Sequence, residues 1–256
     1  MLSEPRPAAP PQEPARRRRW PRVRLAIALG LAAAFAALIG FEVWLWPDVG
    51  ALARQNPRTT AFIERHRAAE RRAGRSDRVA WTFVAYGSIS NHLKRAVIVA
   101  EDIDFFSHHG FSPTELRAAL RRAWEEKRPP RGASTLTQQL AKNLWLSPSR
   151  NPVRKAEEAL LTLELERRLG KRRILELYLN VAEFVAGVYG AEAAARRYFG
   201  KSAAELSEAE AAQLAAVLPR PRRWRPGSDS PAYRRQVASI ERRMARAMWL
   251  PGEIQR

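Results

Sequence analysis

An uncharged run near the amino terminus constrains this chain more than any other feature. From Leu25 to Phe41 no residue carries a charge, and Trp44 and Trp46 follow soon afterwards. An apolar stretch of roughly 17–22 residues is long enough to cross a bilayer as a helix. Tryptophans at its ends are typical of membrane interfaces. We expect residues 25–46 to form a single transmembrane anchor.

Two other interpretations of this run stay open. A cleaved signal peptide would need a small-residue cleavage site, and Ala34-Phe35-Ala36 is a poor one. A buried core helix would normally have a polar face, and none is visible. Arginines are concentrated in residues 1–24, so we expect a cytoplasmic basic tail there, with the rest of the chain on the outer, periplasmic side of the inner membrane.

The composition limits the partners. Lys and Arg number 45 against 26 Asp and Glu, a net charge of +19, which favours anionic partners. Cysteine is absent, which excludes disulfides and thiolate chemistry. An outward-facing basic domain meets lipid head groups and lipid-linked phosphates. We find no basic-aromatic nucleic-acid motif, so we expect membrane lipids and no nucleic acid as partners.

The periodicity after the apolar run predicts a mainly α protein. Residues 48–80 read as a helical stalk or linker, residues 81–89 as a short strand, and residues 126–133 as an exposed basic loop. Ser207 and Glu210 form the pattern of a capping box. Apolar residues at helical spacing predict helices at 93–101, 116–123, 135–146, 153–169, 171–184 and 207–218.

Three segments carry residues suited to chemistry. Glu101 ends an apolar helix face, so burial would raise its pKa and suit it to general acid or base work. Taken alone, Glu101 could be a solvated helix end, and His108 and His109 could belong to a metal site. In the segment from Gly132 to Asn143, small and hydroxyl-bearing residues precede a predicted helix. Exposed amides at such a helix N-terminus would bind an anion or sugar hydroxyls. The segment could also be an N-cap followed by an ordinary polar helix. Residues 154–158 combine two cations with acids, or form an ordinary surface pair.

Taken together and in order, these segments resemble one family. The patterns are Glu-Asp-x-x-Phe-x-x-His-x-Gly, Gly-x-Ser-Thr-x-Thr-Gln-Gln-x-x-Lys-Asn and Arg-Lys-x-x-Glu. They are similar to signatures of glycosyltransferase family 51, the peptidoglycan glycosyltransferases. The stretches after Leu179-Asn180 and after Leu206-Ser207 resemble the fourth and fifth motifs. Ala133 departs from the pattern, since many members have glycine there.

The resemblance implies a fold, an organisation and a reaction. The fold would be a lysozyme-like, two-lobed helical domain preceded by the transmembrane helix. We expect a segment close to the smaller, membrane-facing lobe at 47–80, the catalytic domain at 81–226 and a C-terminal helical extension at 227–256. The enzyme would polymerise lipid II into β-1,4-linked glycan with inversion and release undecaprenyl diphosphate. Its partners would be lipid II, the growing glycan and other cell-wall synthesis or division proteins.

The resemblance also implies roles for residues of this chain. Glu101 would be the general base and Glu158 a second, supporting acid. A divalent cation, Mg²⁺ or Mn²⁺, could assist near Glu158, and no organic cofactor is expected. Asp102, Phe105, His108 and Gly110 would support the loop around the base. The residues that would bind substrate or diphosphate are Ser134, Thr135, Gln138, Gln139, Lys142, Asn143, Arg150 and Arg154.

Three other functions stay open. A lysozyme-like hydrolase would share the fold and a catalytic Glu, and a catalytically silent membrane scaffold would share the anchor. A nucleic-acid-binding protein would account for the charge alone. No serine has lysine three positions later, so we expect no transpeptidase activity.

Overall fold

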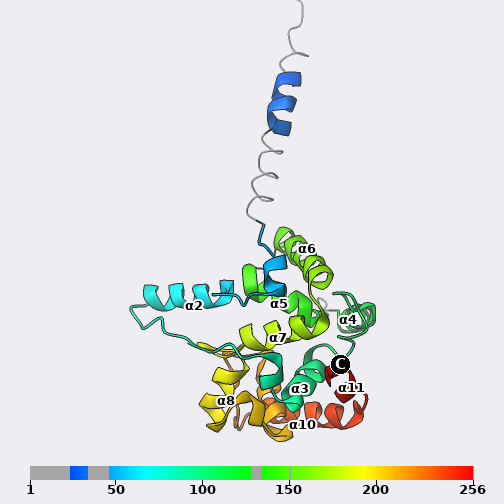
Figure 1. The fold of residues 1–256 in the computed structure, drawn as a ribbon. Helices are drawn as coiled ribbons and strands as arrows, with labels where there is room; N and C mark the ends of the chain where they lie inside the picture. The colour runs from blue at the N-terminus through cyan, green and yellow to red at the C-terminus, as the bar shows by residue number, and fades with distance from the viewer. Residues whose placement is uncertain (1–23, 34–45, 128–133, 150, 256) are drawn as a thin grey trace, which may run out of the picture. The chain divides into compact units, whose positions relative to one another are not determined.

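The computed structural model describes residues 24–33, 46–127, 134–149 and 151–255, and helices dominate them (Figure 1). Residues up to Pro47 and residues from Asp48 onwards form two separate units. In the first unit, residues 24–33 are helical and expose apolar side chains such as Leu25 and Leu31. Among the described residues, no helix is both long and apolar enough to cross a membrane. Much of the predicted anchor, residues 34–45, lies outside the described residues.

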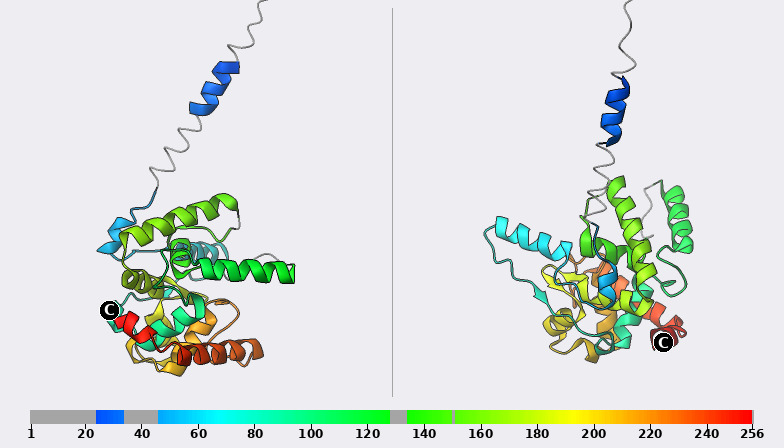
Figure 2. Two further views of the ribbon diagram at one scale, coloured as in Figure 1. Left: turned by 90° about the vertical axis from the view of Figure 1, so that its right-hand side faces the viewer. Right: turned by 45° about the horizontal axis from the view of Figure 1, so that its top comes forward.

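The second unit, Asp48–Arg256, contains all the labelled elements (Figures 1 and 2). Their order follows the chain: η1 (Gly50–Ala53), α2 (Ala61–Arg72), β1 (Ala80–Trp81), η2 (Tyr86–Ser88), α3 (Asn91–Glu101), α4 (Pro113–Glu126), α5 (Leu136–Trp145), α6 (Pro152–Arg168), α7 (Lys171–Val181), β2 (Glu183–Val185), β3 (Val188–Tyr189), α8 (Ala191–Phe199), η3 (Ala203–Glu205), α9 (Glu208–Val217), α10 (Pro231–Arg246) and α11 (Leu250–Gln255). The mainly α prediction is confirmed.

The predicted helices are present as α3, α4, α5, α6, α7 and α9. Gly170 stands between α6 and α7 as the N-cap of α7. The Ser207 side chain accepts from the Glu210 backbone, and the Glu210 side chain accepts from the Ser207 backbone, so the predicted capping box is confirmed. The last predicted residues of α7 are instead outside the helix, which ends at Val181.

The strand predicted at residues 81–89 is wrong beyond its first residue. Only Ala80–Trp81 is a strand, and Tyr86–Ser88 is a 3₁₀ turn. Side chains of α7 take the backbone groups that a ladder would have used. The Asn180 amide bonds both the N–H and the C=O of Val84, and the Glu176 carboxylate accepts from the Tyr86 N–H at 2.7 Å. Sequence periodicity does not reveal such long-range side-chain partners.

A small sheet of order β1-β3-β2 lies beside the helices. β1 runs parallel to β3, with Ala80 opposite Val188, and β2 runs antiparallel to β3. Gly190 follows β3 with φ +81°, and a Cβ there would lie 2.7 Å from the Asn180 carbonyl oxygen. Only glycine fits this close approach.

The core is centred on α3, which packs against α9 and α10, while α5 packs against α6 and α7. Leu93, Val97 and Ile98 of α3 are fully buried. Most residues of α9 after its first turn are buried. Several of them are small, such as Ala212 and Ala215, and let the α9 backbone approach α3 closely. Burying one Leu or Ile side chain contributes roughly 1.5–3 kcal/mol, so α3 is held rigidly and ends at a fixed point, Glu101.

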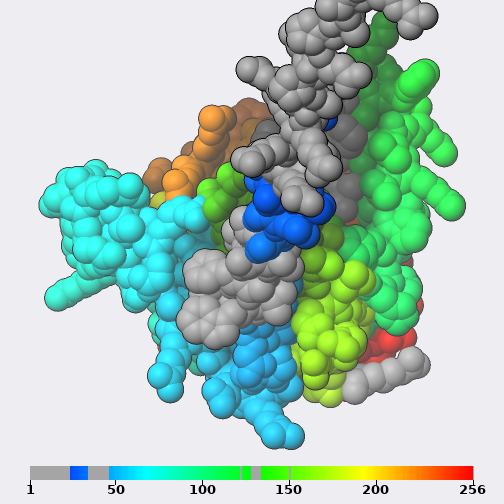
Figure 3. Space-filling model, turned by 90° about the horizontal axis from the view of Figure 1, so that it is seen from above, coloured from blue at the N-terminus to red at the C-terminus, as the bar shows by residue number. Residues whose placement is uncertain are grey.

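Large apolar side chains remain exposed on α4 and α6. α4 lies on the side of the domain opposite α2 (Figure 3). Along α4, Leu116, Leu120 and Trp124 recur every four residues, and Trp124 is 87% exposed. A row at this spacing forms one face of the helix. On α6 the exposed apolar residues are Val153, Leu160 and Leu163.

Candidate active site

Glu101 is the last residue of α3 and is half-buried. Burial raises the pKa of Glu101. A hydrogen bond from Gln139 Nε2 to Glu101 Oε2 at 2.9 Å opposes that effect, as do the charges of Lys142 and Arg243. Such a carboxylate can accept a proton more readily than an exposed one, which suits a general base.

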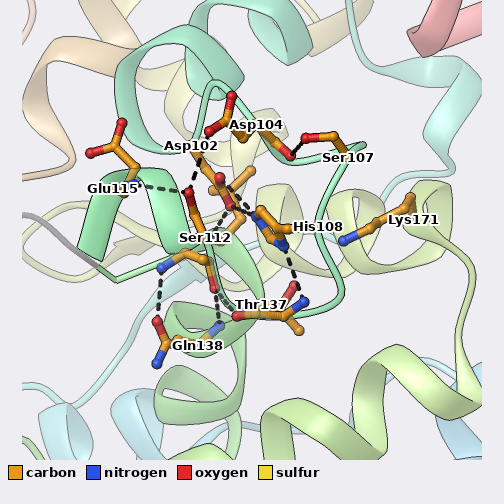
Figure 4. A network of polar contacts seen from close by, with 12 residues as sticks. Asp102, Asp104, Ser107, His108, Ser112, Glu115, Thr137, Gln138 and Lys171 are labelled. Carbon is orange, nitrogen blue, oxygen red and sulfur yellow. Dashed lines mark hydrogen bonds and ion pairs between the residues drawn. The ribbon is translucent and has the colours of Figure 1, made fainter. Parts of the chain in front are cut away.

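The loop after Glu101 is held by a buried network around Asp102 (Figure 4). His108 Nε2 lies 2.9 and 3.0 Å from the two carboxylate oxygens of Asp102, and the Leu136 N–H donates to Oδ2 at 2.9 Å. The Gly110 N–H donates to His108 Nδ1 at 3.0 Å. Nδ1 therefore carries no proton, and Nε2 donates to Asp102. His108 therefore links the Asp102 carboxylate to the Gly110 backbone within the loop.

Phe105 and Gly110 complete this loop. Phe105 is fully buried, and the Lys171 ammonium lies 4.6 Å from its ring centroid. Gly110 has φ +95°, and a Cβ there would lie 2.7 Å from Thr162 Cγ2. His109 is exposed whereas His108 is buried, so the two rings do not converge on one point.

The N-terminus of α5 uses two of the predicted substrate residues in its own cap. The Thr135 hydroxyl accepts from the Gln138 N–H, and Gln138 Oε1 accepts from the Thr135 N–H at 3.0 Å. The Thr135 hydroxyl also donates to the Gly110 carbonyl at 2.7 Å, which ties α5 to the Glu101 loop. Both side chains are buried, while Ser134 beside them is exposed.

The charges of both acids of the site, Glu101 and Glu158, act on Lys142. Lys142 is one turn beyond Gln139 on α5 and is half-buried, whereas the neighbouring Asn143 is buried. Burial lowers the pKa of Lys142, and the nearby charges of Glu158 and Glu101 oppose that effect. A half-buried ammonium group is suited to an anionic ligand.

Arg154 and Glu158 lie one turn apart on α6, which Asn151 caps. Arg154 Nη1 donates to Glu158 Oε2 at 2.5 Å, and the Lys155 ammonium contacts the other carboxylate oxygen. Glu158 is 3% exposed. Arg154 Nε is buried and has no hydrogen-bond partner among the described residues. Arg150, the remaining predicted diphosphate ligand, lies outside the described residues.

The residues near Glu158 do not by themselves fit a divalent cation. Its carboxylate faces two cationic side chains, whose charges oppose metal binding. Within the described part of the chain, no group of three or more His, Cys, Asp or Glu could hold a metal ion.

Comparison with known proteins decides the family. A family model described as transglycosylase matches residues 66–245, which span the helices that carry Glu101, Lys142 and Glu158. The chain belongs to the transglycosylase family. The resemblance inferred from the motifs is thereby confirmed.

Three relatives of this transglycosylase are named biosynthetic peptidoglycan transglycosylase. The relative from Azoarcus sp. strain BH72 is 48% identical over 194 residues, which cover 76% of this chain and 84% of the relative. That from Thiobacillus denitrificans is 44% identical over 215 residues, 84% of this chain and 93% of the relative. That from Bordetella pertussis is 40% identical over 242 residues, 91% of this chain and 97% of the relative.

Two residues of the transglycosylase site were missed by the sequence analysis. Arg243 of α10 places Nη1 3.5 Å from the Ala100 carbonyl oxygen, next to Glu101. No local pattern marks it, because it reaches the site only through the packing of α10 on α3. The Tyr178 hydroxyl donates to Gln139 Oε1 at 3.0 Å. Tyr178 directly precedes Leu179-Asn180 of the fourth motif, which would have been the only indication of its importance.

Proposed function

We propose that this chain is a peptidoglycan glycosyltransferase that polymerises lipid II into β-1,4-linked glycan strands. One observation supports this most strongly. The half-buried carboxylate of Glu101 and the ammonium of Lys142 are near enough for the charge of each to shift the pKa of the other, and the charges of Glu158 and Arg154 act on Lys142 as well. A base near cationic side chains is what transfer from a lipid diphosphate donor requires.

In the proposed reaction, Glu101 takes the proton of the 4-hydroxyl of lipid II, the acceptor. The hydroxyl oxygen forms a bond to the anomeric carbon of the growing glycan, the donor. The bond from that carbon to the diphosphate oxygen breaks, and undecaprenyl diphosphate leaves with the electron pair. Attack from the face opposite the leaving group inverts the carbon from α to β.

Lys142, Arg150 and Arg154 would stabilise the charge that develops on the diphosphate. The buried, unpartnered Nε of Arg154 supports this role, because a buried donor without a partner is costly unless a ligand satisfies it. Glu158 would orient Arg154 and Lys155 rather than act on substrate, since both its oxygens are occupied by these cations.

The other predicted residues divide between substrate and scaffold. We propose that Ser134 and Asn143 contact the sugars, and that Gln139 shapes the site by holding the Glu101 carboxylate. Thr135 and Gln138 would act through the cap of α5, and Asp102, Phe105, His108 and Gly110 through the loop that follows the base. A divalent cation would enter with the phosphates of the substrate, and no step above depends on one.

We propose that residues 25–46 anchor the enzyme in the inner membrane with residues 1–24 in the cytoplasm and the catalytic unit on the periplasmic side. The exposed apolar side chains of residues 24–33 and the +19 charge of the chain support this. The exposed apolar faces of α4 and α6 would lie against the bilayer that carries the lipid substrate.

The test uses the purified full chain in detergent with lipid II. The proposal expects a glycan polymer on a gel, digestion of that polymer by a muramidase, and release of undecaprenyl diphosphate in equal molar amount to the bonds formed. Release of fragments from preformed glycan would favour a hydrolase instead. Neither polymer nor fragments from folded protein, with Mg²⁺ supplied, would favour a silent scaffold and contradict the proposal.

A further inference from the structure

Tyr178 ends a chain of hydrogen bonds that leads to the candidate base. Its hydroxyl donates to Gln139 Oε1 at 3.0 Å, and Gln139 Nε2 donates to Glu101 Oε2 at 2.9 Å. The three side chains come from three helices, α7, α5 and α3. Tyr178 is only 1% exposed, so it cannot contact a bulky substrate itself.

The direction of these bonds matters because the two ends of a glutamine amide have nearly the same shape. Only the NH₂ end can donate to a carboxylate. If the amide of Gln139 were reversed, its oxygen would face Glu101 Oε2, and two acceptors repel each other. In the reversed orientation the Tyr178 hydroxyl would accept from NH₂, and its own proton would lose Gln139 Oε1 as acceptor. The hydroxyl therefore adds to the preference for the orientation in which NH₂ faces the base.

Tyr178 remains a donor over the working range of the enzyme. Burial, followed by the charges of Glu101 and Asp102, holds the pKa of Tyr178 well above its usual value. The hydroxyl therefore keeps its proton at any pH at which a carboxylate base would operate.

We infer that Tyr178 is a positioning residue that fixes the Gln139 amide, and through it the carboxylate of Glu101, in the orientation needed for proton transfer. The inference rests on the proposed role of Glu101 as the base. It gives a fully buried tyrosine hydroxyl a function in the reaction rather than in packing alone.

The consequence is measurable through the ionisation of Glu101. The Gln139 hydrogen bond is the foremost of the effects that lower the pKa of Glu101, ahead of the charges of Lys142 on α5 and Arg243 on α10. The Asp102 carboxylate, on the following loop, acts in the opposite direction. Loss of the amide orientation should therefore raise the pKa of the base as well as misalign it.

The experiment compares Tyr178→Phe with the wild-type chain in lipid II polymerisation across a pH series. Removing one hydroxyl should lower kcat by about 10-fold, the upper size of one hydrogen bond between neutral groups. KM for lipid II should change little, and the acidic limb of the pH profile should move to higher pH. Tyr233→Phe is the matched control. That tyrosine is also buried and its hydroxyl donates to a carbonyl, Gln213 O at 3.2 Å, so its loss should leave the profile unchanged.

A second variant separates positioning from folding. Gln139→Met removes both hydrogen bonds while leaving Tyr178 in place, and it should move the acidic limb in the same direction. Tyr178→Phe added to Gln139→Met should have no further effect, since the hydroxyl acts only through the amide.

Three outcomes are distinguishable. Active wild-type enzyme with an unmoved acidic limb in Tyr178→Phe overturns the inference and leaves the proposed function intact. Effects of the two substitutions that multiply also overturn it, because Tyr178 would then act independently of Gln139. Wild-type protein that makes no polymer contradicts the proposed function itself.

Discussion

Around Glu101 the polar side chains bond to one another, whereas around Arg154 a buried donor is left without a partner among the described residues. Asp102 receives bonds from His108 and from the Leu136 backbone, and Glu101 receives one from Gln139. On the α6 side, Nε of Arg154 has no such bond. We interpret this difference as two functions. The base is oriented by hydrogen bonds before substrate binds, whereas the diphosphate site keeps an unpaired donor that the substrate can satisfy.

The largest effect is expected from removing the base. Glu101→Gln keeps the shape and can still accept from Gln139, but its side chain takes up no proton at working pH. Polymerisation should fall by about 10²–10⁴-fold, the usual contribution of a general base. The measurement is the initial rate of polymer formation from lipid II.

The control for this substitution is Glu241→Gln, which removes an exposed carboxylate from α10. It should leave the rate unchanged. A full rate in Glu101→Gln would contradict the assignment of Glu101 as the base.

The second prediction tests how rigidly the loop around the base is built. Gly110→Ala should lower the free energy of unfolding by about 2–4 kcal/mol, because it adds a left-handed backbone penalty to a 2.7 Å clash with Thr162. Denaturant unfolding measures this. Gly74 also has a positive φ, +67°, but a Cβ there would meet nothing within 4 Å, so Gly74→Ala should cost about 1 kcal/mol. Equal losses in the two variants would show that Gly110 is not tightly packed.

The third prediction concerns the cationic side. Lys142→Met should reduce kcat/KM by roughly 10- to 100-fold, because charge developing on the diphosphate loses a buried partner. Stability should not fall, since burial already disfavours the ammonium, as the lowered pKa of Lys142 indicates. Parallel rate and thermal melting measurements check both statements. A stability loss that matches the loss of activity would make Lys142 a structural residue.

The smallest expected effect is on stability against pH. The pKa of Glu101 is raised in the folded chain, so its contribution to stability is present below its unfolded pKa, 4.5, and is lost as pH rises through the folded pKa. Glu101→Gln should therefore melt at a higher temperature than wild type near neutral pH, and the difference should shrink as the solution becomes acidic. A lower melting temperature at neutral pH would mean that the ionised carboxylate stabilises the fold.

The same contrast explains what the sequence could predict. The helices that carry Glu101, Lys142 and Glu158 follow from local periodicity. The capping box of α9, Ser207 with Glu210, could also be predicted, because it acts within a few residues. The loss of the predicted strand at Val84 could not be predicted, because the side chain of Asn180, far along the chain, bonds the Val84 backbone. Arg243 and Tyr178 were missed for the same reason, since only packing of α10 and α7 brings them to the site. The boundaries at residues 81 and 226 and the membrane anchor stay predictions.

Proton acceptance by Glu101 and stabilisation of the leaving group by Lys142 can be measured together as kcat/KM for lipid II against pH. Wild type should show an acidic limb above 4.5, the ordinary value for a glutamate. Lys142→Met should be slower throughout, with that limb at higher pH because a charge that lowers the pKa of Glu101 is gone. Glu101→Gln should lack the limb and retain only a small residual rate. A Glu101→Gln enzyme that kept both its rate and its acidic limb would contradict the account.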